Sequence, residues 1–157
     1  MLKVVKHLNP TKVVKHLSYW PPYFFSGIKI AEINNEFTKI KVVMKQWPWN
    51  TNYVGSHFGG SLYSMCDPFF MFILLEHMKK DHIIWDKSAE IKFIRPAVGE
   101  VQAEFEITLD QIKQIQKEAL DSYSLSPLLK TKVIDSRGET IALVNKTLYV
   151  RKKDRQK

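Results

Sequence analysis

The chain has 157 residues, of which 45% are hydrophobic and 12% aromatic, so it can build one domain with a packed core and is not disordered. The formal net charge is +8, but residues 1–17 and 151–157 carry this excess while the body between them is balanced, which favours solvated basic ends over nucleic-acid binding. With one cysteine, no signal peptide and no apolar run near the about 20 residues of a membrane span, we expect a cytoplasmic protein.

The first segment favours a short amphipathic helix. Asn9 can cap it, Pro10 can take its first position, and Val13, Val14 and Leu17 share one face. We expect this helix to dock on the core, although a basic amphipathic helix can also touch a membrane surface. The domain organisation is therefore a single domain over residues 1–157, with an N-terminal helical extension of about residues 1–20.

After Gly27 the apolar residues alternate with polar or small ones in two runs, first at Ile28 and Ile30 and then from Ile40 to Met44. Asn34 and the next residue separate the runs as a turn. This pattern predicts a β-hairpin.

Residues 61–79 form the only long apolar segment without alternation, and they predict a central core helix that is covered on most of its surface. Gly59 and Gly60 precede this segment, and Asp67 lies within it. A carboxylate in such surroundings requires an explanation, because burying an unpaired charge is costly.

Alternation returns after Asp81 in four further runs, which predict antiparallel strands with one wet face. They are Ala89 to Phe93, Val101 to Ile107, Lys130 to Asp135 and Glu139 to Arg151. Between the second and third runs, Thr108 and Gln111 have the form of a capping box that opens an amphipathic helix. The predicted fold class is α+β, with an antiparallel sheet of about six strands wrapped round the apolar helix.

These elements resemble a hotdog fold, and the resemblance covers roughly residues 20–152. The motif Asn52-x-x-Gly55-x-x-x-Gly59-Gly60, with an acid seven residues after the second glycine, is similar to the phenylacetyl-CoA and hydroxybenzoyl-CoA thioesterase branch of the superfamily. The longer string from Asn52 to Phe69 is more similar to a bacterial sub-branch known as a domain of unknown function, as are Trp85-Asp86-Lys87 and Phe93-Ile94-Arg95-Pro96. One position departs from the branch, which usually reads His-Gly-Gly, because Phe58 stands here and the histidine is His57.

The glycine pair suggests a site for a thioester carbonyl. The first N–H groups of a helix have no partner within it, so those of Gly59, Gly60 and Ser61 can polarise the carbonyl oxygen. In a continuous helix, seven residues advance about 700° and about 10 Å, which places Asp67 beneath Gly60. Asp67 is then a candidate general base or nucleophile, and Asn52 a candidate to orient water. The resemblance implies that such an acid works opposite the glycine loop of a partner subunit.

Each candidate has a structural alternative. Asp67 precedes Pro68, so it can instead cap a helix that starts there, which would break the continuous helix. His57 can pack in the loop rather than transfer protons, and Asn52 can form a turn. Candidates for the phosphates of coenzyme A lie at strand ends, where solvated cations are also common, and they are Arg95, Lys130, Lys132 and the segment from Arg151 to Lys153.

The leading hypothesis is an acyl-CoA thioesterase that acts as a homodimer or dimer of dimers, with its tunnel between subunits. One alternative is a hydratase or dehydratase that uses His57 and Asp67. Another is a noncatalytic module that binds acyl-CoA or lipid. Coenzyme A enters as part of the substrate, and we expect no cofactor, no nucleic-acid partner and no metal, because the five histidines are scattered and the cysteine has no partner.

Overall fold

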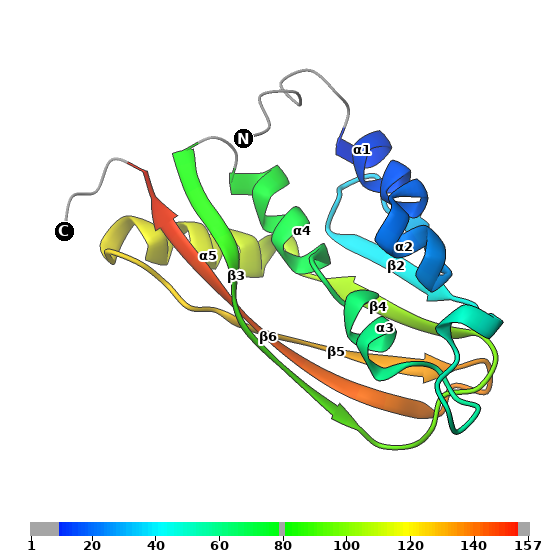
Figure 1. Ribbon diagram of the computed structural model, residues 1–157. Helices are drawn as coiled ribbons and strands as arrows, with labels where there is room; N and C mark the ends of the chain where they lie inside the picture. The colour runs from blue at the N-terminus through cyan, green and yellow to red at the C-terminus, as the bar shows by residue number, and fades with distance from the viewer. Residues whose placement is uncertain (1–9, 79–80, 154–157) are drawn as a thin grey trace.

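The computed structural model describes residues 10–78 and 81–153 (Figure 1). Its helices are α1 (Pro10–His16), α2 (Pro21–Ser26), α3 (Gly59–Ser64), α4 (Phe69–Met78) and α5 (Leu109–Asp121), with short 3-10 turns η1 (Leu17–Tyr19) and η2 (Pro48–Asn50). Its strands are β1 (Ile28–Ile33), β2 (Lys39–Met44), β3 (His82–Phe93), β4 (Val101–Glu106), β5 (Leu128–Asp135) and β6 (Thr140–Lys152). Among the described helices, none has both the length and the apolar character needed to cross a membrane.

All six strands form one antiparallel sheet in the order β1-β2-β4-β5-β6-β3, and α4 lies against its concave face (Figure 1). This confirms the predicted α+β hotdog architecture. The core forms where the aromatic side chains of α4 meet those of the sheet. The ring centroids of Phe69 and Phe70 lie 5.0 Å and 5.2 Å from that of Phe105, and all three side chains are buried. The sheet and α4 therefore hide each other's apolar surfaces.

The central apolar segment over residues 61–79 forms two consecutive helices, because the helix is interrupted between Ser64 and Phe69. Of the two alternatives, the structure therefore shows the break at Pro68 and not the continuous helix. Pro68 cannot donate a hydrogen bond to the carbonyl of Ser64, and its ring would clash with the preceding turn. The Asp67–Pro68 peptide bond is cis. The carbonyl of Pro68 instead accepts the first hydrogen bond of α4, from the Phe72 N–H at 3.2 Å, so Pro68 itself has the capping position. The break sets Asp67 outside both helices.

The N-terminal helices cover one side of the core above β1 and β2 (Figure 1). Val14 of α1 and Tyr23 of α2 are buried, and the Tyr23 hydroxyl donates to the main-chain carbonyl of Asp67. The predicted cap Asn9 lies outside the described residues. The extension therefore packs on the domain and reaches the break between α3 and α4.

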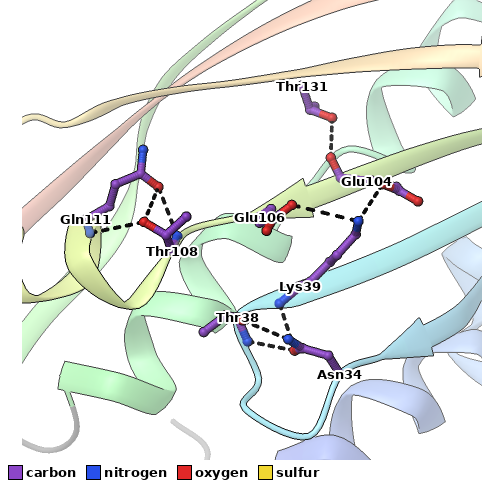
Figure 2. A network of polar contacts seen from close by, with 8 residues as sticks. All are labelled: Asn34, Thr38, Lys39, Glu104, Glu106, Thr108, Gln111 and Thr131. Atoms are coloured by element: carbon purple, nitrogen blue, oxygen red, sulfur yellow. Dashed lines mark hydrogen bonds and ion pairs between the residues drawn. The ribbon is translucent and has the colours of Figure 1, made fainter.

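Side-chain contacts to the backbone fix two predicted boundaries, as Figure 2 shows. In the β1–β2 turn, the Asn34 carboxamide oxygen accepts from the N–H groups of Thr38 and Lys39, each at 2.9 Å. At the start of α5, the predicted capping box forms, because the Thr108 hydroxyl accepts from the N–H of Gln111 and the Gln111 side chain accepts from that of Thr108.

Candidate functional site

A cavity of about 420 Å³ opens beside the start of α3. Its wall includes four residues that sequence reasoning singled out, namely Asn52, His57, Gly59 and Arg95. Leu62 and the segment from Phe93 to Ala97 complete most of the lining, so the cavity is largely apolar with a few polar groups. Such a mixture is typical of a small-molecule site.

Asn52 holds the loop that leads into the cavity. Its side-chain N–H groups donate to the Ser56 hydroxyl at 2.9 Å and to the His57 carbonyl at 3.2 Å. Its side-chain oxygen accepts from the N–H groups of Val54 at 3.0 Å and Ser56 at 3.1 Å. These four contacts use both donors and both lone pairs of the carboxamide, so the geometry gives Asn52 a loop-forming role and leaves it no group for water.

His57 is buried beneath the same loop. Its Nε2 lies 2.7 Å from the carbonyl oxygen of Gly99, which can only accept, so Nε2 carries the proton in the neutral ring. Burial lowers the pKa of His57, and the Gly99 carbonyl opposes this in part. Nδ1 is buried and has no hydrogen-bond partner in the described part of the chain. His57 is therefore a neutral ring with one free acceptor.

The glycine pair opens α3. Within residues 10–78 and 81–153, the N–H groups of Gly59 and Gly60 contact no acceptor, whereas that of Ser61 bonds to the Phe58 carbonyl at 3.0 Å. Because α3 has only six residues, its dipole is short and the two free N–H groups are the relevant donors. A Cβ atom on Gly60 would lie 2.3 Å from the Phe58 ring, so the exposed Phe58 side chain would have to move to admit a side chain there.

Asp67 belongs to a different cluster, centred on a buried lysine. Lys146 of β6 has a side chain only 1% exposed, and its Nζ lies 2.5 Å from Asp67 Oδ1 and 3.1 Å from Asp86 Oδ1. It also donates to the Tyr63 hydroxyl at 3.2 Å. The Asp67 side chain is 42% exposed, so its carboxylate is not sealed inside the protomer. It does not cap α4, contrary to the structural alternative.

Burial and charge act against each other in this cluster. Burial alone lowers the pKa of Lys146. The hydrogen bond and charge of Asp67, together with Asp86 and Tyr63, raise this pKa by more than burial lowers it. The net pKa is therefore raised, and the ammonium persists. Burial is also the largest cause that raises the pKa of Asp86, followed by its hydrogen bond to Asp67, while Lys146 lowers it. Asp86 therefore holds its proton to a higher pH than an ordinary aspartate does.

The remaining predicted residues do not meet in one place. Asp67 does not line the cavity that holds Gly59. Lys130 and Lys132 line a hollow on the other, wet face of β4 and β5. Arg151 lies over the ring of Tyr123, and it is nine residues along β6 from the residue that pairs with Phe93, or about 30 Å in an extended strand. Within one chain, only Arg95 of the phosphate candidates reaches the cavity, where it also pairs with Glu139 at 2.8 Å.

Sequence reasoning missed Lys146 and the contact of Asp86 with Asp67. A signal for Lys146 is present in β6, because it occupies the inward phase of the alternation between Val144 and Leu148. A lysine in that phase must be buried with partners or break the pattern. Asp86 likewise follows Ile84 on the inward phase of β3, but the register shift after it hides the continuation.

β3 forms one edge of the sheet and pairs with β6 on one side only in the described chain. Large apolar side chains stand exposed along and beyond it, with Trp85 at 48%, Phe93 at 51% and Ile94 at 45%. A twelve-residue open edge with such side chains is a template for pairing with another strand. The cavity lies next to this edge, since Phe93 and Ile94 also line it.

Comparison with known proteins identifies the family. A family model described as a domain of unknown function (DUF4442) matches residues 11–150, and the chain belongs to this family. A comparison with curated protein sequences finds no match.

Solved structures share the fold at low sequence identity. A probable thioesterase from Pseudomonas aeruginosa superposes with a TM-score of 0.79 at 21% identity, over 92% of this chain and 97% of that one. A thioesterase from Haemophilus influenzae gives 0.68 at 13% identity, over 96% of both chains. A mutant of the phenylacetic acid degradation protein from Thermus thermophilus gives 0.59 at 18% identity, over 83% and 98%. These likenesses establish the hotdog fold.

Proposed function

We propose that this DUF4442 protein hydrolyses acyl-CoA thioesters, with Asp67 as general base or nucleophile and the free N–H groups of Gly59 and Gly60 as the oxyanion site. The observation that carries the proposal is the position of the Asp67 carboxylate, which a buried lysine holds at the protein surface. This carboxylate is neither sealed in the core nor used as a helix cap. The fold that this chain shares with proteins described as thioesterases supports the same reaction class.

The chemistry requires two things. The carbonyl oxygen of the thioester gains negative charge when it is attacked, and two N–H groups without other partners stabilise that charge. With Asp67 as general base, it takes a proton from a water molecule that attacks the carbonyl carbon, the C–S bond breaks, and coenzyme A leaves as the free thiol with that proton. With Asp67 as nucleophile, the carboxylate displaces the coenzyme A thiolate to form an anhydride, which water then hydrolyses to the free acid. The cavity beside the glycine pair offers an apolar wall for the acyl part of the substrate and Arg95 for a phosphate.

Two copies of the chain are needed to bring these groups together, because Asp67 does not line the cavity of its own chain. We propose a homodimer that pairs at the β3 edge, so that Asp67 of one copy faces the glycine pair of the other. The exposed Phe93 and Ile94 support this arrangement, since they line the cavity and remain open in the single chain. The buried thiol of Cys66 supports a reducing compartment, and a cytoplasmic location stays a prediction.

Release of free thiol from a panel of acyl-CoA esters of increasing chain length tests the activity. We expect turnover by the wild type and a loss of about 10²- to 10⁴-fold in kcat for Asp67→Asn, the range that proton transfer by a positioned side chain contributes. Asp110→Asn is the matched control, because Asp110 is 95% exposed on α5 and belongs neither to the cavity nor to the lysine cluster. No turnover on any ester, or equal rates for both variants, would refute the hydrolytic assignment.

Noncatalytic binding of acyl-CoA is the second candidate, because the ion pair with Lys146 by itself gives Asp67 a structural reason to be present. Calorimetry with acyl-CoA separates the two functions, because binding without any release of thiol supports the noncatalytic binding module. The hydratase alternative is weaker, because His57 lines the cavity while Asp67 lies in the lysine cluster. Its test is loss of enoyl-thioester hydration in His57→Ala without release of thiol.

A further inference from the structure

We propose that Lys146 is the positioning residue of this site, which holds Asp67 through Oδ1 and leaves Oδ2 for the reaction, and that Asp86 is the second carboxylate that shares the ammonium. This inference rests on the proposed function, in which Asp67 acts on the thioester. Nothing in the resemblance or in the sequence pattern assigned either residue a role.

Four separate parts of the chain converge on the Lys146 ammonium. Tyr63 comes from α3, Asp67 from the break between the helices, Asp86 from β3, and Lys146 itself from β6. An ammonium has three N–H donors, and three oxygens surround this one at 2.5 Å, 3.1 Å and 3.2 Å. Two of its donors make hydrogen bonds, to Asp67 Oδ1 and to the Tyr63 hydroxyl, and the ion pair with Asp86 is a third contact. These contacts hold the ammonium and the Asp67 oxygen bound to it in place.

Stability does not explain a buried lysine at this place. Taking an ammonium and its partners out of water costs free energy that their attraction barely repays, and apolar side chains of similar volume are often as stable. The neighbouring inward positions of β6 are apolar, with Val144 and Leu148 both fully buried. A methionine would fit the same pattern, so the charge at Lys146 points to a task that needs the charge.

That task follows from the exposure of the two carboxylate partners. The Asp86 side chain is 23% exposed and that of Asp67 is 42% exposed, so Asp67 is the carboxylate that faces outward. A carboxylate has two oxygens, and the bond from Lys146 occupies one of them. Fixing Oδ1 therefore orients Oδ2. A small displacement of a reacting carboxylate lowers the rate strongly.

Tyr23 and Cys66, two other titratable groups beside the cluster, stay neutral. Burial raises the pKa of Tyr23, whose hydroxyl contacts the Asp67 carbonyl, and burial raises the pKa of Cys66 to about 12. Tyr63 takes part as a hydroxyl and through its ring, whose centroid lies 5.3 Å from the Lys146 Nζ. The ionisable groups of the ion pairs in this cluster are thus Lys146, Asp67 and Asp86.

Kinetics of matched lysine variants provide the first test. Lys146→Met should lower kcat by about 10²-fold with KM nearly unchanged, because it misplaces a reacting group without removing a substrate contact. Lys146→Arg should recover part of kcat, since it restores the charge with a different shape. Lys39→Met is the control, because Lys39 also bridges two carboxylates, Glu104 and Glu106, but on the wet face of the sheet. Equal kcat values for the Lys146 and Lys39 variants would overturn the proposal.

A readout without activity separates this inference from the proposed function. Carbon-detected NMR titration of the Asp86 carboxyl should show its pKa raised in Lys146→Met, which removes the positive charge that lowers it, and lowered in Asp67→Asn, which removes a negative charge that raises it. If Lys146→Met does not fold, the Asp67→Asn and Lys146→Arg titrations carry the test. An Asp86 pKa that stays the same in these variants would overturn the proposed coupling of Asp86 to Lys146 and Asp67. If the variants show the expected pKa shifts but the wild type shows no turnover, hydrolysis is refuted, while the contact by which Lys146 positions Asp67 is supported.

Discussion

Cys66 sits beside the charged cluster but is fully buried, and the loss of solvation on burial raises the pKa of its thiol to about 12. Only the thiolate reacts rapidly with alkylating and disulfide reagents, so we expect an inert thiol in the folded protein at pH 8. Titration with a chromogenic disulfide should detect no thiol before denaturant is added and one thiol per chain afterwards. Rapid labelling of the folded chain would contradict this burial.

Asp86 should leave a signature in the pH dependence of stability. Its pKa is raised in the folded protein, chiefly by burial, so between the ordinary aspartate value of 3.8 and the raised value the folded chain binds more protons than the unfolded one. The free energy of unfolding should therefore fall as pH rises through that window. Asp86→Asn should remove this fall, as urea titrations at a series of pH values would show, and an identical pH dependence in both proteins would contradict it.

Individual site residues were only partly predictable from the sequence. Asn52, His57, Gly59 and Arg95 do line one cavity, because a short loop and a strand end carry them. The partner of Asp67 was not predictable, since Lys146 lies 79 residues away and local pattern does not encode which strands become neighbours. The inward phase of β6 marks Lys146 as a buried position, but it does not encode the carboxylates that Lys146 meets.

Among the elements, the passage from α2 to β1 depends on one glycine. Gly27 has a φ of 71°, and a Cβ there would lie 2.7 Å from the Lys45 carbonyl oxygen and 2.7 Å from the Trp47 ring. Gly138, in the β5–β6 turn, has a similar φ of 81° but open space around it. Gly138→Ala should therefore cost only backbone strain of about 1–2 kcal/mol, and Gly27→Ala should cost more because a clash is added.

Thermal or urea unfolding of the two alanine variants measures this difference. Equal destabilisation by Gly27→Ala and Gly138→Ala would show that the Gly27 contacts relax freely, and it would contradict the close packing of the Trp47 loop on the start of β1.

The element that sequence periodicity misjudged is the central helix. Apolar residues recur through residues 61–78 without a gap, so composition alone predicts one helix. Proline chemistry decides otherwise at Pro68, and the strands and the capped α5 followed their patterns because no residue within them opposes the expected hydrogen bonds. Local chemistry thus outweighed hydrophobic periodicity at Pro68.

For the whole molecule, the open edge of β3 predicts a dimer. Light scattering after size exclusion should give about twice the chain mass of 18.4 kDa, because the exposed apolar edge is covered by a second copy. Phe93→Asp should yield monomers, whereas the control Phe25→Asp, which changes a phenylalanine that is 64% exposed on α2, should remain a dimer. A wild type that elutes with the mass of one chain would contradict the pairing.

The most direct test of the central claim is complementation between two inactive variants. Asp67→Asn removes the carboxylate and Gly60→Val blocks the glycine pair, so each homodimer should be inactive in thiol release. After joint refolding of equal amounts, about half of the dimers contain one chain of each variant. Each of these mixed dimers has one intact site out of two, so we predict about a quarter of the wild-type rate. A mixture that stays as inactive as its parents would contradict a site built from the Asp67 of one copy and the Gly60 of the other.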